Sequence, residues 1–226
     1  MFRILLSNHY DNVDDLLNPR IGVLKINNIG RDWTANQNSN RYVYDPHKAI
    51  NSIATRSDEI DPNSPTLIDT EHINNNGPGR KAIAQILEIF HQVTGYSCQV
   101  GIAKYSLSDP TLPYQKDRYG EPDVLENVQF IIVWAKAIDL SEWHDALAAS
   151  CEAVIGYHKP VYADISPTWH QSKNSGRPLQ PAKVASMIQH AHACSCNGAI
   201  IRDYYDTTLG QTYYESIVNM VNRINR

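Results

Sequence analysis

Short apolar runs alternate with segments of helical periodicity along most of this chain, from about residue 64 to its end. The strongest apolar run, residues 128–134, is almost continuous, which is typical of a strand buried on both faces of a parallel sheet. In the segment 80–93, apolar residues recur at i, i+3, i+4 and i+7, so one face of a helix is expected to be buried there. Strands separated by crossover helices predict a parallel sheet with right-handed connections.

Eight strands are expected, each followed by a helix or a loop. They are predicted over residues 2–6, 21–26, 41–44, 66–70, 98–104, 128–134, 160–164 and 198–202. Helices are expected over residues 46–57, 80–93, 141–155, 181–193 and 210–225. This order predicts the α/β class and a compact (β/α)8 barrel of the TIM type, in one domain over residues 1–226, since such barrels usually take about 200–250 residues. The gap between the first two strands is too short for a standard helix, so the first third is expected to be irregular or shortened.

The composition is that of an ordinary globular protein and excludes several function classes. The chain has 20 lysine and arginine residues against 24 aspartate and glutamate residues, and this net charge of −4 argues against a nucleic-acid binder held by phosphate contacts. No apolar run reaches the roughly 18 residues of a membrane span. The N-terminal segment lacks the features of a signal peptide, so a cytoplasmic protein, or one exported without a Sec signal, is expected. The four cysteines are expected to be reduced thiols, because their spacing fits neither a disulfide framework nor a zinc site.

Two carboxylates stand at the end of the expected fourth strand. Asp69 and Glu71 are two residues apart, so both side chains point to the same side of that strand. In a parallel barrel the carboxyl ends of the strands carry the active site. Two close carboxylates repel each other, which favours protonation of one of them, and a protonated carboxyl is what a general acid requires. The alternative is that Asp69 caps the following turn and Glu71 is a solvated loop residue.

Other strand ends carry further acidic and aromatic residues. Asp164 ends the seventh expected strand, and Asp203 follows the eighth. Aromatic rings stack on the apolar faces of sugars, and amide and carboxylate groups bond to sugar hydroxyls. The residues expected to contact a carbohydrate are Trp134, Tyr162, Trp169, Tyr204, Tyr105 and Asn27. Each aromatic residue taken singly also fits a packing role, and only their coincidence at one end of the barrel predicts a sugar site.

Other chemistries have weaker support. A metal-dependent hydrolase using Asp69, Glu71 and His72 is one alternative, but no second group of ligands accompanies these residues, so neither a metal nor a cofactor is expected. The segment 76–80 precedes a helix but lacks the Lys-Ser/Thr pair of a phosphate-binding loop. No G-x-S-x-G motif is present, which disfavours a serine hydrolase of the α/β type.

The chain resembles the (β/α)8 glycoside hydrolases that carry Asp-x-Glu at the end of strand four, among them chitinase-like and hyaluronidase-like enzymes and muramidase-type lysozymes. The resemblance extends over about residues 64–206 and is carried by Leu-Ile-Asp-Thr-Glu at 67–71, Trp134, Lys-Pro-Val at 159–161 and Gly-Ala-Ile-Ile at 198–201. It implies that Glu71 is the general acid and that Asp69 assists it. The chain departs from the fuller chitinase motif, since Pro65, Thr66 and Leu67 stand where that motif has further aspartates.

These patterns lead to one main hypothesis and one alternative. The main hypothesis is a glycoside hydrolase that cleaves a polysaccharide, with N-acetylated sugars as one candidate class. Glu71 would protonate the leaving oxygen, Asp69 would tune Glu71 or orient an acetamido group, and Asp164 or Asp203 would be the second carboxylate. The alternative is a non-catalytic carbohydrate-binding or structural protein on a barrel scaffold, since a fold does not determine a function. The expected partner is a carbohydrate, with neither nucleic acid nor a membrane.

Overall fold

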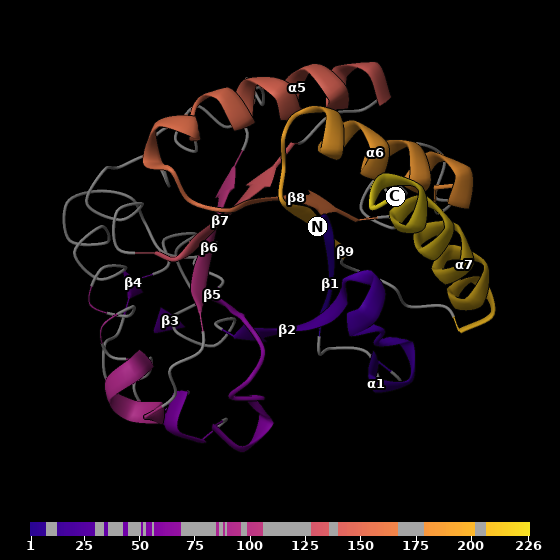
Figure 1. Cartoon of the computed structure of the whole chain (residues 1–226). Helices are drawn as coiled ribbons and strands as arrows, with labels where there is room; N and C mark the ends of the chain where they lie inside the picture. Colours follow the sequence, from indigo (N-terminus) through magenta and orange to yellow (C-terminus); the bar gives the residue numbers. More distant parts are fainter. Residues whose placement is uncertain are drawn as a thin grey trace.

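The computed structural model shows a closed barrel of parallel strands with helices around it (Figure 1). The residues that the structure describes are 1–7, 13–29, 34–35, 43–44, 51, 53–55, 57–68, 85, 88, 90–95, 99–105, 128–135, 140–166, 179–201 and 207–226. Among them, seven strands form the barrel in the order β1-β2-β5-β6-β7-β8-β9, and β9 pairs with β1 to close it. The architecture is therefore the α/β barrel that the alternation of strands and helices predicts.

The barrel strands lie close to their expected positions. They are β1 (Arg3–Ser7), β2 (Val23–Ile29), β5 (Thr66–Ile68), β6 (Val100–Tyr105), β7 (Phe130–Trp134), β8 (Val161–Ile165) and β9 (Gly198–Ile201). All neighbouring pairs in the ring are parallel. Their side chains alternate between the barrel interior and the surrounding layer, as the pleat of a strand requires.

The prediction that residues 41–44 form the third strand of the barrel is wrong. Val43–Tyr44 forms β4, which pairs antiparallel with β3 (Thr34–Ala35) in a separate two-stranded sheet. In the barrel, β2 pairs directly with β5, with Asn27 opposite Thr66, and no place is left for a strand between them. The barrel therefore closes with seven of the eight expected strands. Residues 43 and 44 satisfy their backbone hydrogen bonds with a nearby strand, and such local pairing costs less loop-closure entropy than insertion into the ring.

Three long helices cover one side of the barrel. They are α5 (Leu140–Glu152), α6 (Pro181–Ala193) and α7 (Thr207–Ile224), and Figure 1 shows them outside β7, β8, β9 and β1. The prediction for residues 181–193 is confirmed at both ends; Pro181 fits the first helical position because its missing N–H would have no partner there. The shorter elements are α1 (Val13–Leu16), η1 (Pro19–Ile21), η2 (Ser57–Glu59) and η4 (Ile155–Tyr157). Residues 51, 53–55, 85, 88 and 90–94 are also helical; they lie within the helices expected over 46–57 and 80–93, except that the second continues one residue further, to 94.

The buried apolar residues form two layers. The inner cluster lies inside the barrel and consists of Leu5, Ile26, Leu67, Phe130, Ile132, Tyr162 and Ile200. The outer cluster lies between the barrel and the elements around it and includes Ile4 and Leu6 of β1, which flank Leu5 in the sequence. Two buried layers account for the continuous apolar runs of β7 and β9, because both faces of these strands are covered.

Two glycines permit close approaches in the barrel. A Cβ atom at Gly101 would overlap the ring of Phe130, its register partner on β7. A Cβ atom at Gly198 would overlap the carbonyl oxygen of Arg3 and contact the ring of Tyr162. These positions let two large inner rings fit inside a narrow barrel, since a residue with a side chain would collide with them.

Candidate functional site

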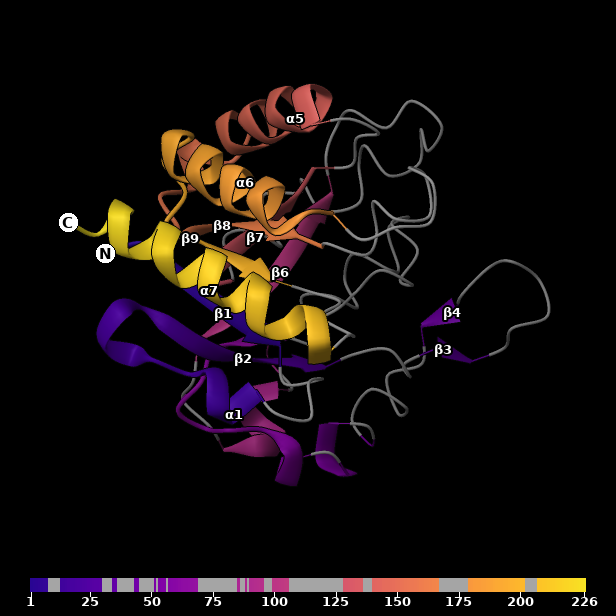
Figure 2. The same cartoon turned by 90° about the vertical axis from the view of Figure 1, so that its right-hand side faces the viewer.

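The carboxyl ends of the barrel strands face one side of the molecule. Figure 2 shows the strands running from the side where both chain termini lie toward the opposite side, beyond which β3 and β4 lie. Because every strand in the ring is parallel, all seven described strands end on that opposite side. Catalytic groups of α/β barrels come from these strand ends and the loops after them. A search for a functional site therefore begins there.

Asp164 is a buried carboxylate inside the barrel near the carboxyl end of β8. Its register partner on β9 is Ile200, a member of the inner cluster. Its neighbours Ala163 and Ile165 belong to the outer cluster, so alternation along β8 directs Asp164 to the interior. Its side chain is only 2% exposed. Aspartate is rarely buried so completely, and a buried carboxylate at the functional end of a barrel is a candidate site residue.

Tyr162 lies on the same face of β8 as Asp164, one step further from the strand end. Its ring packs edge-to-face against Phe130, with ring centroids 5.7 Å apart and an interplanar angle of 84°. The residue is 5% exposed and belongs to the inner cluster. The contacts of Tyr162 are those of a core residue that fills the barrel beneath Asp164, and its expected contact with a sugar stays a prediction.

Tyr105 and Trp134 are neighbours at the carboxyl ends of two adjacent strands. Tyr105 is the last residue of β6 and Trp134 the last residue of β7, and the backbone register places them opposite each other. The structure thus brings together two of the aromatic residues expected in a sugar site, at the level of the backbone. Their side chains lie outside the described part of the structure.

Asn27 faces outward from β2 and forms hydrogen bonds to the chain segment that leads into β5. Its Nδ2 atom donates to the carbonyl oxygens of Asp61, at 2.9 Å, and Ser64, at 3.3 Å, and to Oγ1 of Thr66, at 3.1 Å. Its Oδ1 atom accepts from the backbone N–H of Asp61 at 3.1 Å. The residue is completely buried. These contacts show a structural role for Asn27, and its expected sugar contact stays a prediction.

The turn that Asn27 holds is itself closed by a short hydrogen bond. The hydroxyl of Ser64 donates to Oδ2 of Asp61 at 2.5 Å. This bond, more than any other effect, holds the pKa of Asp61 below its ordinary value, and the backbone N–H of Asn63 acts in the same direction. The Asp61 carboxylate thus remains ionised as an acceptor within the turn before β5.

Five of the expected site residues lie outside the described part of the structure. They are Asp69, Glu71, Trp169, Asp203 and Tyr204. Asp69 directly follows Ile68, the last residue of β5, and Asp203 comes two residues after Ile201, the last residue of β9. The strands that precede these carboxylates are thus parts of the barrel. His72, considered above as a metal ligand, also lies outside the described residues.

Ser166 is a polar residue at this end of the barrel that the sequence analysis did not single out. It directly follows β8, two residues after Asp164, and is 6% exposed. A hydroxyl at the residue after a strand could have been found by extending the strand-end search by one position. Ser166 is added to the candidate site because a buried hydroxyl can donate a hydrogen bond as well as accept one.

Two other features are absent from the described residues. No group of three or more histidine, cysteine or acidic side chains there is arranged to hold a metal ion. No helix in the described part of the chain is long and apolar enough to cross a membrane.

Solved structures with a similar fold include several glycoside hydrolases. Bee venom hyaluronidase superposes with a TM-score of 0.63 at 11% sequence identity, over 100% of both chains. The glycoside hydrolase family 18 N-acetylglucosaminidase of Paenibacillus barengoltzii gives a TM-score of 0.55 at 8% identity, over 97% of this chain and 100% of that one. The chitinase of Chromobacterium violaceum gives 0.53 at 8% identity, over 93% and 83% of the two chains.

These similarities show the fold alone, because sequence identity is so low. No family model matches the chain. No curated protein matches it at the level of sequence. The barrel is therefore of the type found in hyaluronidase and chitinase structures, and the chemistry must be argued from the residues of this chain.

Proposed function

We propose that this protein is a glycoside hydrolase that cleaves a polysaccharide with carboxylate groups at the carboxyl ends of the barrel strands. The observation that carries the proposal is Asp164, a carboxylate buried inside the barrel near the end of β8. The similarity of the barrel to hyaluronidase and chitinase structures supports it. Enzymes that hydrolyse glycosidic bonds commonly use a pair of carboxyl groups that flank the bond.

The order of strands in the ring suggests how the carboxylates are divided. β8 and β9 are neighbours; Asp164 lies on β8, and Asp203 follows β9 in the sequence. β5, which Asp69 and Glu71 follow, is separated from β8 by β6 and β7. The proposal assigns Glu71 as the general acid, Asp69 as the group that tunes it, and Asp164 or Asp203 as the second carboxylate across the barrel mouth. A carboxyl separation of about 5–5.5 Å would give retention of configuration, and one of about 6.5–9.5 Å inversion.

The aromatic residues at the strand ends would hold the sugar. Tyr105 and Trp134 are proposed as neighbouring parts of one stacking surface, because the register of β6 and β7 places them side by side. Trp169 and Tyr204 are proposed as further contacts on the loops after β8 and β9. N-acetylated polysaccharides are the first substrates to test.

The proposal is tested by measuring hydrolysis of hyaluronan, chitin and peptidoglycan fragments by the purified protein and by Glu71→Gln and Asp164→Asn. Removal of a general acid or base is expected to reduce kcat about 10²–10⁴-fold. Glu152→Gln and Asp145→Asn, at exposed positions of α5, are the matched controls and are expected to keep the wild-type rate. Circular dichroism and thermal unfolding establish that each variant is folded.

Two results would overturn the assignment. Equal turnover by the wild type, Glu71→Gln and Asp164→Asn would show that these carboxylates are not catalytic. Binding of a glycan by the wild type without turnover of any substrate would favour the alternative function, a carbohydrate-binding protein on a barrel scaffold. Calorimetric titration with the same oligosaccharides measures that binding directly.

A further inference from the structure

Two cysteines lie in contact on the helical side of the barrel, away from the candidate site. Cys151 is in the last turn of α5, and Cys196 is in the turn between α6 and β9. Their Sγ atoms are 3.4 Å apart, although 45 residues separate them in the sequence. The three cysteines that the structure describes are all free thiols. A disulfide bond has an S–S distance of about 2.05 Å, so only a small approach separates this pair from a bond.

The backbone holds Cys196 in this position. The N–H of Cys196 donates to the carbonyl oxygen of Ala191, and the N–H of Ser195 donates to that of His192, each at 3.0 Å. With Ser195 in the left-handed region at φ 63°, these bonds form a Schellman motif that ends α6. Asn197 continues the anchoring, because its side-chain oxygen accepts from the N–H of Val161 at 2.9 Å. The turn therefore presents the Cys196 thiol to Cys151 from a fixed backbone.

The two thiols are not equivalent. Cys151 is partly exposed, whereas Cys196 is 5% exposed. The hydrogen bond between them lowers the pKa of Cys151, and that bond together with burial raises the pKa of Cys196. Either thiol can donate the hydrogen bond, and Cys151 is the more accessible of the two. The thiolate form is the one that reacts with oxidants.

We propose that Cys151 and Cys196 are a site of reversible oxidation, at which a hydroperoxide oxidises the two thiols to an intramolecular disulfide. In the first step, the Cys151 thiolate attacks one oxygen of the hydroperoxide: an S–O bond forms, the O–O bond breaks, and the other oxygen leaves as hydroxide or alkoxide. The attacked oxygen keeps its hydrogen, so the product at Cys151 is a sulfenic acid, and the departing hydroxide or alkoxide takes up a proton from water. In the second step, the sulfur of Cys196 attacks that of Cys151, an S–S bond forms, and the S–O oxygen leaves as water with the thiol proton of Cys196.

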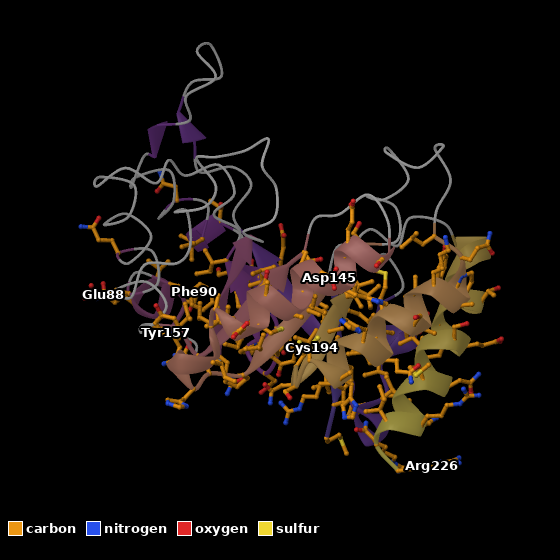
Figure 3. The ribbon with its side chains drawn as sticks, turned by 90° about the horizontal axis from the view of Figure 1, so that it is seen from above. Glu88, Phe90, Asp145, Tyr157, Cys194 and Arg226 are labelled. Atoms are coloured by element: carbon orange, nitrogen blue, oxygen red, sulfur yellow. The ribbon has the colours of Figure 1, made fainter. Side chains whose placement is uncertain are left out.

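Cys194 is the competing partner and provides the control. It lies two residues from Cys196, and its Sγ atom is 3.4 Å from Nε2 of His190 rather than against Cys151. Burial raises the pKa of Cys194, and so does the nearby Cys151. The geometry thus favours the 151–196 pair over the 151–194 pair. Figure 3 shows Cys194 on the helical side of the molecule.

The experiment treats the full chain with hydrogen peroxide, blocks the remaining thiols and maps tryptic peptides by mass spectrometry. Trypsin leaves Cys151 in the peptide 137–173 and both Cys194 and Cys196 in the peptide 184–202, since it does not cut before proline. The expected product is these two peptides joined, with the mass of two hydrogens lost, and separated again by dithiothreitol. Cys194→Ser is expected to keep this product and Cys196→Ser to lose it. The oxidised protein is also expected to unfold at a higher temperature, because the crosslink restricts the unfolded chain.

The proposal fails if the joined peptides persist in Cys196→Ser and disappear in Cys194→Ser, since the partner would then be Cys194. It also fails if both thiols of the wild type remain free to be alkylated under peroxide that oxidises a free low-molecular-weight thiol. Circular dichroism of both serine variants shows whether a lost product reflects lost chemistry. If Cys196→Ser is unfolded, Cys196→Ala takes its place, because alanine leaves no buried hydroxyl.

Discussion

The imidazole rings of His144 and His190 stack on each other, with centroids 3.9 Å apart and planes inclined by 16°. His144 belongs to α5 and His190 to α6, so the stack joins two helices of the outer layer. Nε2 of His190 also lies 3.2 Å from the carbonyl oxygen of His144. The rings of Trp143 and His190 are in edge-to-face contact, with their centroids 6.2 Å apart. Two positive charges in such a stack would repel each other, so protonation of both rings would weaken the contact between α5 and α6.

The first prediction concerns stability at acid pH. Burial lowers the pKa of His144 below its ordinary value of 6.5, and the charge of His190 lowers it further, while Asp145 acts in the opposite direction. The unfolded chain therefore binds more protons at this residue than the folded protein, and stability falls as the pH falls through the ordinary histidine pKa. Denaturant unfolding at pH 7.5 and pH 5.5 is expected to show a smaller loss for His144→Phe than for the wild type.

The control for this measurement is His158→Asn. His158 is exposed and has a left-handed backbone with φ 53°, which asparagine tolerates. This variant is expected to lose as much stability on acidification as the wild type. A wild-type loss also seen in His144→Phe would show that the stacked pair does not carry the effect.

The second prediction concerns the closure of the barrel at Gly198. A methyl group there would overlap the carbonyl oxygen of Arg3, and a backbone atom cannot move aside as a side chain can. Gly198→Ala is expected to lower the free energy of unfolding by about 1–3 kcal/mol, as overpacking does. Gly156→Ala is the matched control, since among the described residues no atom beyond its chain neighbours lies within 4 Å of the Cβ it would add. Equal denaturation midpoints for the two variants would contradict this reading of the barrel.

A third prediction concerns Asn27. Asn27→Ala removes the donor to three acceptors and leaves the partly buried N–H of Asp61 without its acceptor. The expected loss is about 1–3 kcal/mol in the free energy of unfolding, which is the usual cost of unsatisfied buried groups. Asn63→Ala, at an exposed position of the same turn, is expected to change stability little, because alanine keeps the backbone N–H that donates to Asp61 at 2.9 Å. Urea denaturation of both variants decides the matter, and similar losses would count against a specific role for Asn27.

Ser195 is the subject of the fourth prediction. Its left-handed backbone, with φ 63°, is unfavourable for a residue with a side chain and free of that cost for glycine. Ser195→Gly is expected to raise the free energy of unfolding by about 0.5–1 kcal/mol after the extra flexibility of glycine in the unfolded chain is subtracted. Ser141→Gly, the same change within α5, is expected to lower it, since glycine is a poor helix former. A loss of stability in both variants would show that backbone strain at Ser195 is not significant.

Local patterns predicted the elements well where the pattern was long. The near-continuous run at 128–134 became β7, and the proline-led segment 181–193 became α6 with both ends as expected. Gly95, which follows the helix expected over 80–93, has a positive φ of 67° and donates its N–H to the carbonyl oxygen of His91. In each case the pattern lies in residues that are close together in the sequence, and local packing and capping are enough to form the element.

The expected third strand shows where such reasoning fails. A four-residue run such as 41–44 fits a barrel strand and a local hairpin equally well, because the pattern of its side chains does not specify which strand it pairs with. Only the pairing of β2 with β5 shows that the ring has no room for it. Strand existence is a local property, whereas strand order depends on contacts between distant segments.

For the candidate site, the sequence indicated which polar residues follow strands, but not how they are buried. Asp164, Tyr162 and Asn27 were all expected at a sugar site. The structure places Asp164 inside the barrel, Tyr162 in its core and Asn27 on its outer face. Alternation along one strand separates the two faces but does not say which face is the interior, and that is decided by the neighbouring strands.

By itself, then, the sequence determined an α/β barrel of parallel strands and helices. It also indicated acidic and aromatic residues at the strand ends, because periodicity is a property of residues that are close together in the sequence. The tertiary structure alone decided that the ring closes with seven described strands, that Asp164 faces inward and that Cys151 meets Cys196 across 45 residues. These outcomes depend on which distant segments bury each other's surfaces, and burial is a property of the whole chain.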